Sequence, residues 1–254
     1  MKSSITISLP QIPVTKGDVS ANLKHHIVAI SRSSQQNADV AVFPELSLTG
    51  YELELASDLA FDPQPSAFTE LSQAAVTHEV VVIAGCPLNG SASSKPTIGS
   101  VICFPDGKVD FYSKQYLHSG EEVYCSRGEG DYHFELKGNQ VALAICADFI
   151  EPLHSTRAKA MGADVYLVSA LISEMGFEPD SKLLSDIAST HNLPVLLSNH
   201  ISVTGGWDTC GKNSIWGAEG NRVTLPNSRE ECLVLCTIDN DNIEARCVKD
   251  TALA

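Results

Sequence analysis

Three side chains that could act together in catalysis each stand at the end of a short apolar stretch. Glu45 follows DVAVFP, Lys114 ends KVDFYSK, and Cys146 ends NQVALAIC. Strand ends in α/β proteins collect reactive side chains at one edge of a sheet. A carboxylate there can take the proton of the thiol, the thiolate can attack a carbonyl or nitrile carbon, and the ammonium can stabilise the charge that develops on the substrate. A free thiol has a pKa of about 8.5, so few thiols are ionised at neutral pH without such help.

Each of these three residues, taken alone, also has an ordinary structural interpretation. A cysteine that follows an apolar run such as VALAI is usually a core residue. A glutamate after Phe-Pro is more often a loop carboxylate, and a lysine in YSKQY is normally a solvated surface residue. The pattern therefore becomes specific only through the order and the local context of the three residues together.

The elements that must position these residues are short strands that alternate with helices. Strands rich in Val, Ile and Leu are predicted over 4–12, 39–46, 79–88, 97–105, 108–114, 139–146, 163–170, 193–200, 213–221 and 231–239. Helices are predicted after Asp18 as the N-cap, over 65–78, from Pro152 to Gly162, and after Asp180 as the N-cap. FPDGKVDFYS predicts a hairpin with an Asp-Gly turn at 106–107. These patterns favour one α/β domain with a mixed sheet and helices on the outside.

The composition limits the classes of function. The chain has 254 residues, of which 43% are hydrophobic and 19% charged, so a sizeable core is expected. A net charge of −14 without a cluster of Lys and Arg disfavours nucleic-acid binding. No segment reaches about 20 apolar residues, so we expect no membrane span and a cytoplasmic protein whose eight cysteines are mostly reduced thiols. The absence of C-x-x-C and H-E-x-x-H spacing gives no sign of a metal site.

Three segments resemble the signature segments of the nitrilase superfamily of carbon–nitrogen hydrolases. They are FPELSLTGY (43–51), YSKQYL (112–117) and VALAICADF (141–149), in the family's order Glu, Lys, Cys, and the resemblance extends over nearly the whole chain. It implies an α-β-β-α four-layer sandwich of the nitrilase type, in which two sheets stack face to face with helices outside. Residues 1–254 are expected to form one such domain.

The resemblance also implies roles for individual residues. Glu45 matches the general base, Lys114 the oxyanion-stabilising lysine and Cys146 the nucleophile. The backbone N–H of Ala147 is expected to be a second oxyanion donor. Asp148 is expected to hydrogen-bond local backbone and to hold the turn at the nucleophile in place, in preference to a catalytic role.

The family often adds a second active-site glutamate shortly after the lysine. HSGEEVYCSRG offers Glu121 and Glu122. The family usually places this glutamate three residues before a Tyr or Phe, so Tyr124 favours Glu121, while Glu122 and a purely solvated loop remain alternatives. Trp207 in TGGWDTCG could line the pocket or could instead be a packed anchor of its loop, and Met175 and Phe177 in LISEMGFEP are further candidates for the pocket wall.

The chain departs from the family pattern at three positions without losing a member of the triad. Tyr116 stands where the family often has His, and Leu153 stands where a Glu often follows the proline of the helix after the nucleophile. Ala147 stands where an aromatic residue is common, which would leave extra room beside the thiol. These departures bear on the substrate more than on catalysis.

The expected function is hydrolysis of a non-peptide C–N bond in a small-molecule amide or N-carbamoyl compound. A thioester on Cys146 is the expected intermediate, and neither a metal nor an organic cofactor is needed. The triad does not decide between amide and nitrile, so a nitrilase is an alternative. A nitrilase-like module that binds a ligand without turning it over is another.

The resemblance further implies an assembly. Family members usually pair through the outer helices beside the nucleophile, which here are the helix that starts at Pro152 and the one from about 180 to 191. PLHSTRAKAMG contains small residues that would let two helices approach closely. We therefore expect a homodimer or a larger even-numbered homo-oligomer.

Overall fold

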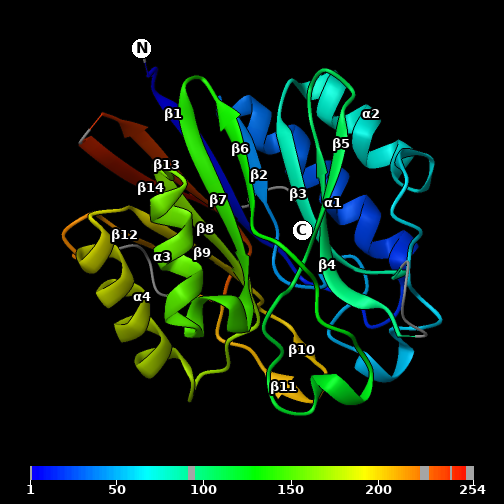
Figure 1. Ribbon diagram of the computed structural model, residues 1–254. Coiled ribbons are helices and arrows are strands. Elements are labelled where there is room, and N and C mark those ends of the chain that lie inside the picture. Colours follow the sequence, from blue (N-terminus) through cyan, green and yellow to red (C-terminus); the bar gives the residue numbers. More distant parts are fainter. Residues whose placement is uncertain (1, 91–94, 224–228, 241, 250–254) are drawn as a thin grey trace.

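Two β-sheets lie face to face between two pairs of helices (Figure 1). The computed structural model describes residues 2–90, 95–223, 229–240 and 242–249. The layer order, with α1 and α2 outside one sheet and α3 and α4 outside the other, confirms the α-β-β-α sandwich implied by the resemblance. The residue pattern alone predicted one mixed sheet, whereas the sandwich has two. That prediction was wrong because period-two patterns do not reveal which strands pair. That the single domain spans 1–254 stays a prediction.

The first sheet has seven strands in the order β14-β13-β1-β2-β3-β4-β5. The neighbours β1, β2 and β3 are parallel and the remaining pairs are antiparallel. Its strands are β1 Ile5–Gln11, β2 Val40–Val42, β3 Val81–Leu88, β4 Thr97–Cys103, β5 Val109–Ser113, β13 Cys232–Asp239 and β14 Asn242–Lys249. Its outer face packs against α1 Val19–Gln35 and α2 Thr69–His78, which is preceded by the 3₁₀ turn η2 Pro65–Phe68. Asp18 caps α1 as predicted, since its side chain accepts a hydrogen bond from the Ala21 N–H.

The second sheet has five strands in the order β12-β9-β8-β7-β6, of which β7, β8 and β9 are parallel. Its strands are β6 Tyr132–Leu136, β7 Asn139–Ile145, β8 Val165–Ala170, β9 Val195–Asn199 and β12 Ser214–Trp216. Its outer face carries α3 Pro152–Ala160 and α4 Phe177–His191. Short elements beside the strand ends are η1 Leu53–Leu55, η3 Glu121–Val123, η4 Cys146–Ile150, β10 Val203–Thr204 and β11 Trp207–Asp208.

Burial on both faces explains why the strands are apolar throughout. In β7, Leu143 and Ile145 point into the core between the two sheets, whereas Ala142 and Ala144 point towards the helices of the outer layer. The inward side chains are large and the outward ones small, which leaves room for α3 and α4. Because β7 is held on both faces, the residue that follows it, Cys146, has a fixed position.

Three predicted elements differ from the structure. The strand predicted over 39–46 ends at Val42, because Pro44 has no N–H for a sheet and the chain turns there. The strand predicted over 213–221 is reduced to β12. The helix predicted to start after Asp180 begins at Phe177 with Gly176 as its N-cap, so Asp180 is inside α4 and caps nothing.

Candidate active site

Glu45, Lys114 and Cys146 come from both sheets and meet between their ends. Glu45 follows β2, Lys114 follows β5, and Cys146 follows β7. Lys114 Nζ lies 2.7 Å from Glu45 Oε1, and both side chains have 0% exposure. The second carboxylate oxygen, Glu45 Oε2, is buried and makes no hydrogen bond with the described protein atoms. That oxygen is therefore available to take the thiol proton from Cys146, whose proximity affects the pKa of Glu45.

The loop that carries Glu45 is fixed by a close approach to β3. Leu48 N–H donates to the carbonyl of Gly85 at 2.9 Å, and Gly85 N–H donates to Ser47 Oγ at 3.1 Å. A Cβ at Gly85 would lie 2.3 Å from the Leu46 nitrogen, so only glycine fits. From the other sheet, His200 Nε2 lies 2.6 Å from the carbonyl oxygen of Glu45. Burial lowers the pKa of His200 to about 4, so the imidazole is neutral and donates this hydrogen bond.

Cys146 sits on a sharp turn from strand to 3₁₀ helix. Its φ of 43° lies in the left-handed region that a non-glycine residue adopts only when its surroundings hold it there. Asp148 supplies that hold: its Oδ2 accepts from Ile145 N–H at 2.9 Å, and its Oδ1 accepts from Gln115 N–H at 2.9 Å and Tyr116 N–H at 3.0 Å. The nucleophile turn is thus tied to the residues directly after Lys114. This matches the positioning role expected for Asp148.

Ala147 follows Cys146 in the first turn of η4 and is buried. Backbone N–H groups in the first turn of a helix have no partner within the helix. The N–H of Ala147 is therefore in the right part of the chain for a second oxyanion donor, and this role stays a prediction.

The structure brings Glu121, and not Glu122, to the lysine. Glu121 Oε1 lies 2.7 Å from Lys114 Nζ and accepts a short hydrogen bond of 2.5 Å from the Tyr51 hydroxyl. Its other oxygen accepts from His118 N–H at 2.7 Å. Glu122 is exposed and accepts from Gly120 N–H. The ammonium of Lys114 is consequently held between two buried carboxylates.

The ionisation of the site follows from this burial. Burial raises the pKa of Glu45 to about 7, against the opposing effect of the Lys114 ammonium. Burial alone would lower the pKa of Lys114, but Glu45, Cys146 and Glu121 outweigh it, so the pKa lies above its usual value. Burial also raises the pKa of the Cys146 thiol. At neutral pH the thiol is therefore protonated, and Glu45 is poised to remove its proton at the moment of attack.

A cavity of about 290 Å³ opens onto the thiol and is the space available to a substrate. Its wall includes Glu45, Cys146, Tyr51, His118, Asp180 and Trp207. A neighbouring cavity of about 570 Å³ shares Tyr51, His118 and Trp207 with it. Trp207 is thus part of the wall, which is one of the two roles that the sequence left open for it.

The other two residues considered for the pocket wall do not line this cavity. Met175 is 90% exposed, and Phe177 is buried in the core beneath α4. Sequence reasoning assigned Asp180 to a helix N-cap and therefore did not expect it in the cavity wall. Tyr51, which also lines the cavity, was not among the residues expected in the pocket wall.

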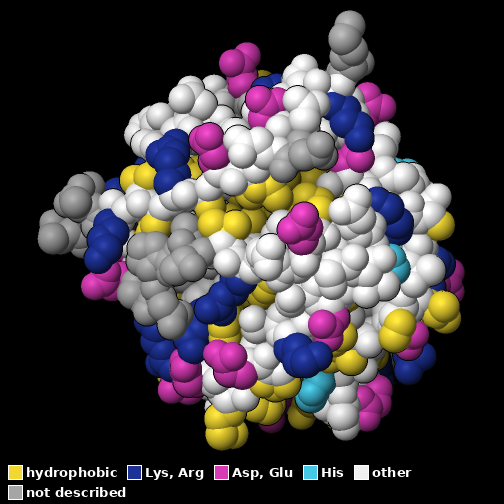
Figure 2. All heavy atoms as spheres, turned by 90° about the vertical axis from the view of Figure 1, so that its left-hand side faces the viewer, with side chains coloured by type: hydrophobic (Ala, Val, Ile, Leu, Met, Phe, Trp, Pro, Cys, Tyr) yellow, Lys and Arg dark blue, Asp and Glu magenta, His cyan; other side chains and the backbone are white. Residues whose placement is uncertain are grey.

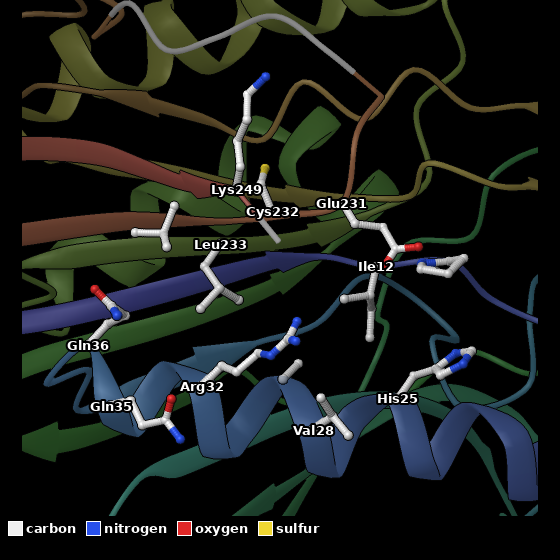
Figure 3. Close-up of a pocket in the computed structure, with 13 residues that line it drawn as sticks. Ile12, His25, Val28, Arg32, Gln35, Gln36, Glu231, Cys232, Leu233 and Lys249 are labelled. Carbon is white, nitrogen blue, oxygen red and sulfur yellow. The ribbon is translucent and has the colours of Figure 1, made fainter. Parts of the chain in front are cut away.

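A separate groove of about 190 Å³ lies between α1 and the β13–β14 hairpin (Figure 3). His25, Val28 and Arg32 reach it from the helix, and Leu233 and Lys249 from the hairpin. It shares no lining residue with the cavity at Cys146. The groove is therefore not part of the catalytic site.

In the ranges that the structure describes, His, Cys, Asp and Glu side chains form no group of three or more that could hold a metal ion. None of the described helices is both long enough and apolar enough to cross a bilayer.

The four-layer fold and the Glu–Lys–Cys set between its strand ends are those of nitrilase-superfamily enzymes. A family model described as "Carbon-nitrogen hydrolase" matches residues 6–246, so the chain belongs to this family and is a carbon–nitrogen hydrolase. It is 29% identical over 242 residues to 2-oxoglutaramate amidase of Bacillus subtilis (strain 168), covering 92% of this chain and 90% of the relative. It is also 24% identical to glutamine-dependent NAD(+) synthetase of Aquifex aeolicus (strain VF5), covering 92% of this chain and 42% of that protein.

A solved structure is similar over most of its length. The structure of a mutant amidase from Nesterenkonia sp. AN1 in complex with butyramide has a TM-score of 0.82 and 22% identity, and covers 94% of this chain and 92% of the amidase. At that identity the likeness shows the fold alone.

Proposed function

We propose that this chain hydrolyses a small-molecule amide through an acyl-thioester on Cys146. The observation that carries the proposal is the buried Lys114 ammonium, which lies 2.7 Å from Glu45, a residue that lines the same cavity as the Cys146 thiol. The Bacillus relative supports an amide over a nitrile, since that protein is named as an amidase.

In the proposed first half-reaction, sulfur attacks the amide carbon while the thiol proton moves to Glu45. The Lys114 ammonium and the Ala147 N–H stabilise the oxyanion. Glu45 then gives its proton to the leaving nitrogen, and the C–N bond breaks to release ammonia or an amine. The acyl group remains on Cys146 as a thioester.

In the second half-reaction, Glu45 takes a proton from water as the water attacks the thioester. The C–S bond breaks, the acid leaves, and the proton returns from Glu45 to the sulfur, so one carboxylate alternates between base and acid. Glu121 contributes by holding the Lys114 ammonium, with its own oxygen fixed by the Tyr51 hydroxyl at 2.5 Å.

An N-carbamoyl compound would use the same steps and remains within the proposed substrate class. A binding module without turnover is less well supported, because a binding site would gain nothing from placing a lysine with 0% exposure between two carboxylates. With a nitrile, the proton on Glu45 would go to a nitrogen that stays bonded to the carbon, whereas the amide nitrogen leaves once it is protonated. No observation favours a nitrile substrate.

Mass spectrometry of the intact protein tests the proposal. The protein is mixed with a library of small amides, N-carbamoyl compounds and nitriles and quenched with acid within milliseconds to seconds. We expect a mass increase equal to the acyl group, located on Cys146 by peptide mapping and absent from Cys146→Ala protein. Cys247→Ala is the matched control, since Cys247 is also a partly exposed thiol and its variant should still be acylated. An adduct on another cysteine, or none with any compound, would contradict the mechanism.

We also propose that the chain forms a homodimer through the side that carries α3 and α4. Leu153 and Met161, at the two ends of α3, are 59% and 37% exposed, while Ala158 faces the sheet. Figure 2 shows the side of the molecule that carries α4, where acidic, basic and hydrophobic side chains are interspersed. Light scattering at low micromolar concentration should give twice the chain mass of 27.2 kDa, and a monomer at that concentration would refute the proposal.

A further inference from the structure

One carboxylate in the catalytic cavity has no partner. Asp180 lines the cavity together with Cys146, and its side chain makes no hydrogen bond or ion pair with any residue that the structure describes. It faces the cavity because α4 begins at Phe177, which puts Asp180 in the first turn of the helix. Burial raises the pKa of the half-buried Asp180 carboxyl group, so its surroundings disfavour the ionised form.

The walls around Asp180 offer no free positive charge to a substrate. Neither of the two adjoining cavities has a Lys or Arg among the described residues that line it. His118 is the one lining residue that could carry a positive charge, and its charge acts on Asp180. The Lys114 ammonium is already held by Glu45 and Glu121.

The cations next to the cavity wall are engaged as well. Lys212 pairs with Glu174 at 2.5 Å, and Arg229 pairs with Asp208 at 2.8 Å. The first turn of α4 would by itself attract an anion, but it carries Glu178 and Asp180. A substrate carboxylate at this wall would therefore meet the Asp180 carboxylate, with His118 as the one described lining side chain that could attract it.

We propose, on the basis of the amide hydrolysis proposed above, that Asp180 binds a cationic group of the substrate. The preferred amide then carries a primary amine at the end of its acyl chain and no carboxylate there. This differs from 2-oxoglutaramate, the compound in the name of the Bacillus relative, which carries a carboxylate. An ammonium at Asp180 would satisfy the unpartnered carboxylate and would place the amide carbon in the same cavity as the thiol.

A trio of amides of matched length tests the proposal. They are 4-aminobutanamide with an ammonium, pentanamide with a methyl group and glutaramate with a carboxylate at the same position. We expect kcat/KM for 4-aminobutanamide to exceed that for pentanamide by about 10- to 100-fold, the range of a charge-assisted hydrogen bond, and glutaramate to be the poorest. Asp180→Asn should bring the ratio of the first two close to one.

Two further variants keep the test decisive. Glu178→Gln is the matched control, because Glu178 lies in the same turn but is exposed and outside the cavity, so the ratio should stay as in the unmodified protein. Asp180→Lys should invert the order in favour of glutaramate, a gain that a damaged fold cannot produce. A wild-type preference for pentanamide, or a ratio that Asp180→Asn does not change, would overturn the proposal.

Binding without turnover separates this inference from the proposed function. Calorimetric titration of Cys146→Ala protein with the same three amides should give the order ammonium, methyl, carboxylate. If that order is found but the unmodified protein hydrolyses none of the three, amide hydrolysis is wrong and the recognition by Asp180 stands. If hydrolysis occurs and the binding order is absent, the role of Asp180 is wrong and hydrolysis stands. If neither hydrolysis nor the binding order is found, both the proposed amide hydrolysis and the proposed role of Asp180 are wrong.

Discussion

Cys146→Ala protein is expected to lose amide hydrolysis by a factor of about 10⁶, the scale seen when a nucleophile is removed from a cysteine- or serine-type site. The thiol is the only group that can hold the acyl intermediate in the proposed cycle. Alanine adopts the φ of 43° no less readily than cysteine, so the turn should keep its shape. We expect the free energy of unfolding to change by less than about 1 kcal/mol.

The measurement is ammonia release from the best amide, together with thermal unfolding of the same samples. Cys247→Ala serves as the control and should retain full activity, because Cys247 lies on β14, away from the cavity. Full hydrolysis by Cys146→Ala protein would rule out the thioester mechanism.

Glu45→Gln is expected to lower kcat by at least about 10⁴, because one carboxylate serves both half-reactions. The amide of glutamine has the same shape and can still accept a hydrogen bond from Lys114 through Oε1. It cannot take the thiol proton. Acyl-enzyme should therefore not accumulate, and mass spectrometry of the quenched protein should show only the free chain. Rapid acylation of Glu45→Gln protein would mean that another base acts.

The pH dependence of the unmodified enzyme checks the same assignment. Since burial raises the pKa of Glu45 to about 7, its base form is present above that pH and is lost as the pH falls through it. With pentanamide, which does not titrate in this range, kcat/KM should fall about tenfold per pH unit below about pH 7. A rate that stays constant down to pH 5 would show that ionised Glu45 is not needed.

The sequence located the reactive residues because each stands directly after a strand or a strand-like segment. Glu45, Lys114 and Cys146 were predicted from strand ends and from the order of their segments, and the structure brings them together. The stacking of two sheets could not be derived from the residue pattern, since it depends on pairings such as β1 with β13, which join opposite ends of the chain. The resemblance supplied that part.

Two local misses have physical causes. β14 was not predicted, because NIEARCVK alternates polar residues on the exposed edge of its sheet and has no apolar run. Asp180 was predicted as an N-cap, but α4 begins at Phe177, since proline is tolerated in the first helical turn, where its missing N–H costs nothing. The error hid a carboxylate of the cavity wall.

Four hydrogen bonds to Asp148 fix the segments that carry the catalytic residues, so substitutions there are expected to be harmful. Other segments of the cavity wall make none of these bonds and should tolerate substitution. Besides the three backbone donors, Asp148 Oδ2 accepts from the Tyr112 hydroxyl at 2.7 Å, so β5 with its lysine and β7 with its cysteine are joined through one buried side chain. The cavity wall at Asp180 and Trp207 belongs to other segments, which make none of these bonds. Laboratory evolution towards new amides should therefore collect its substitutions in those wall segments, while Asp148 and the pair it joins stay invariant.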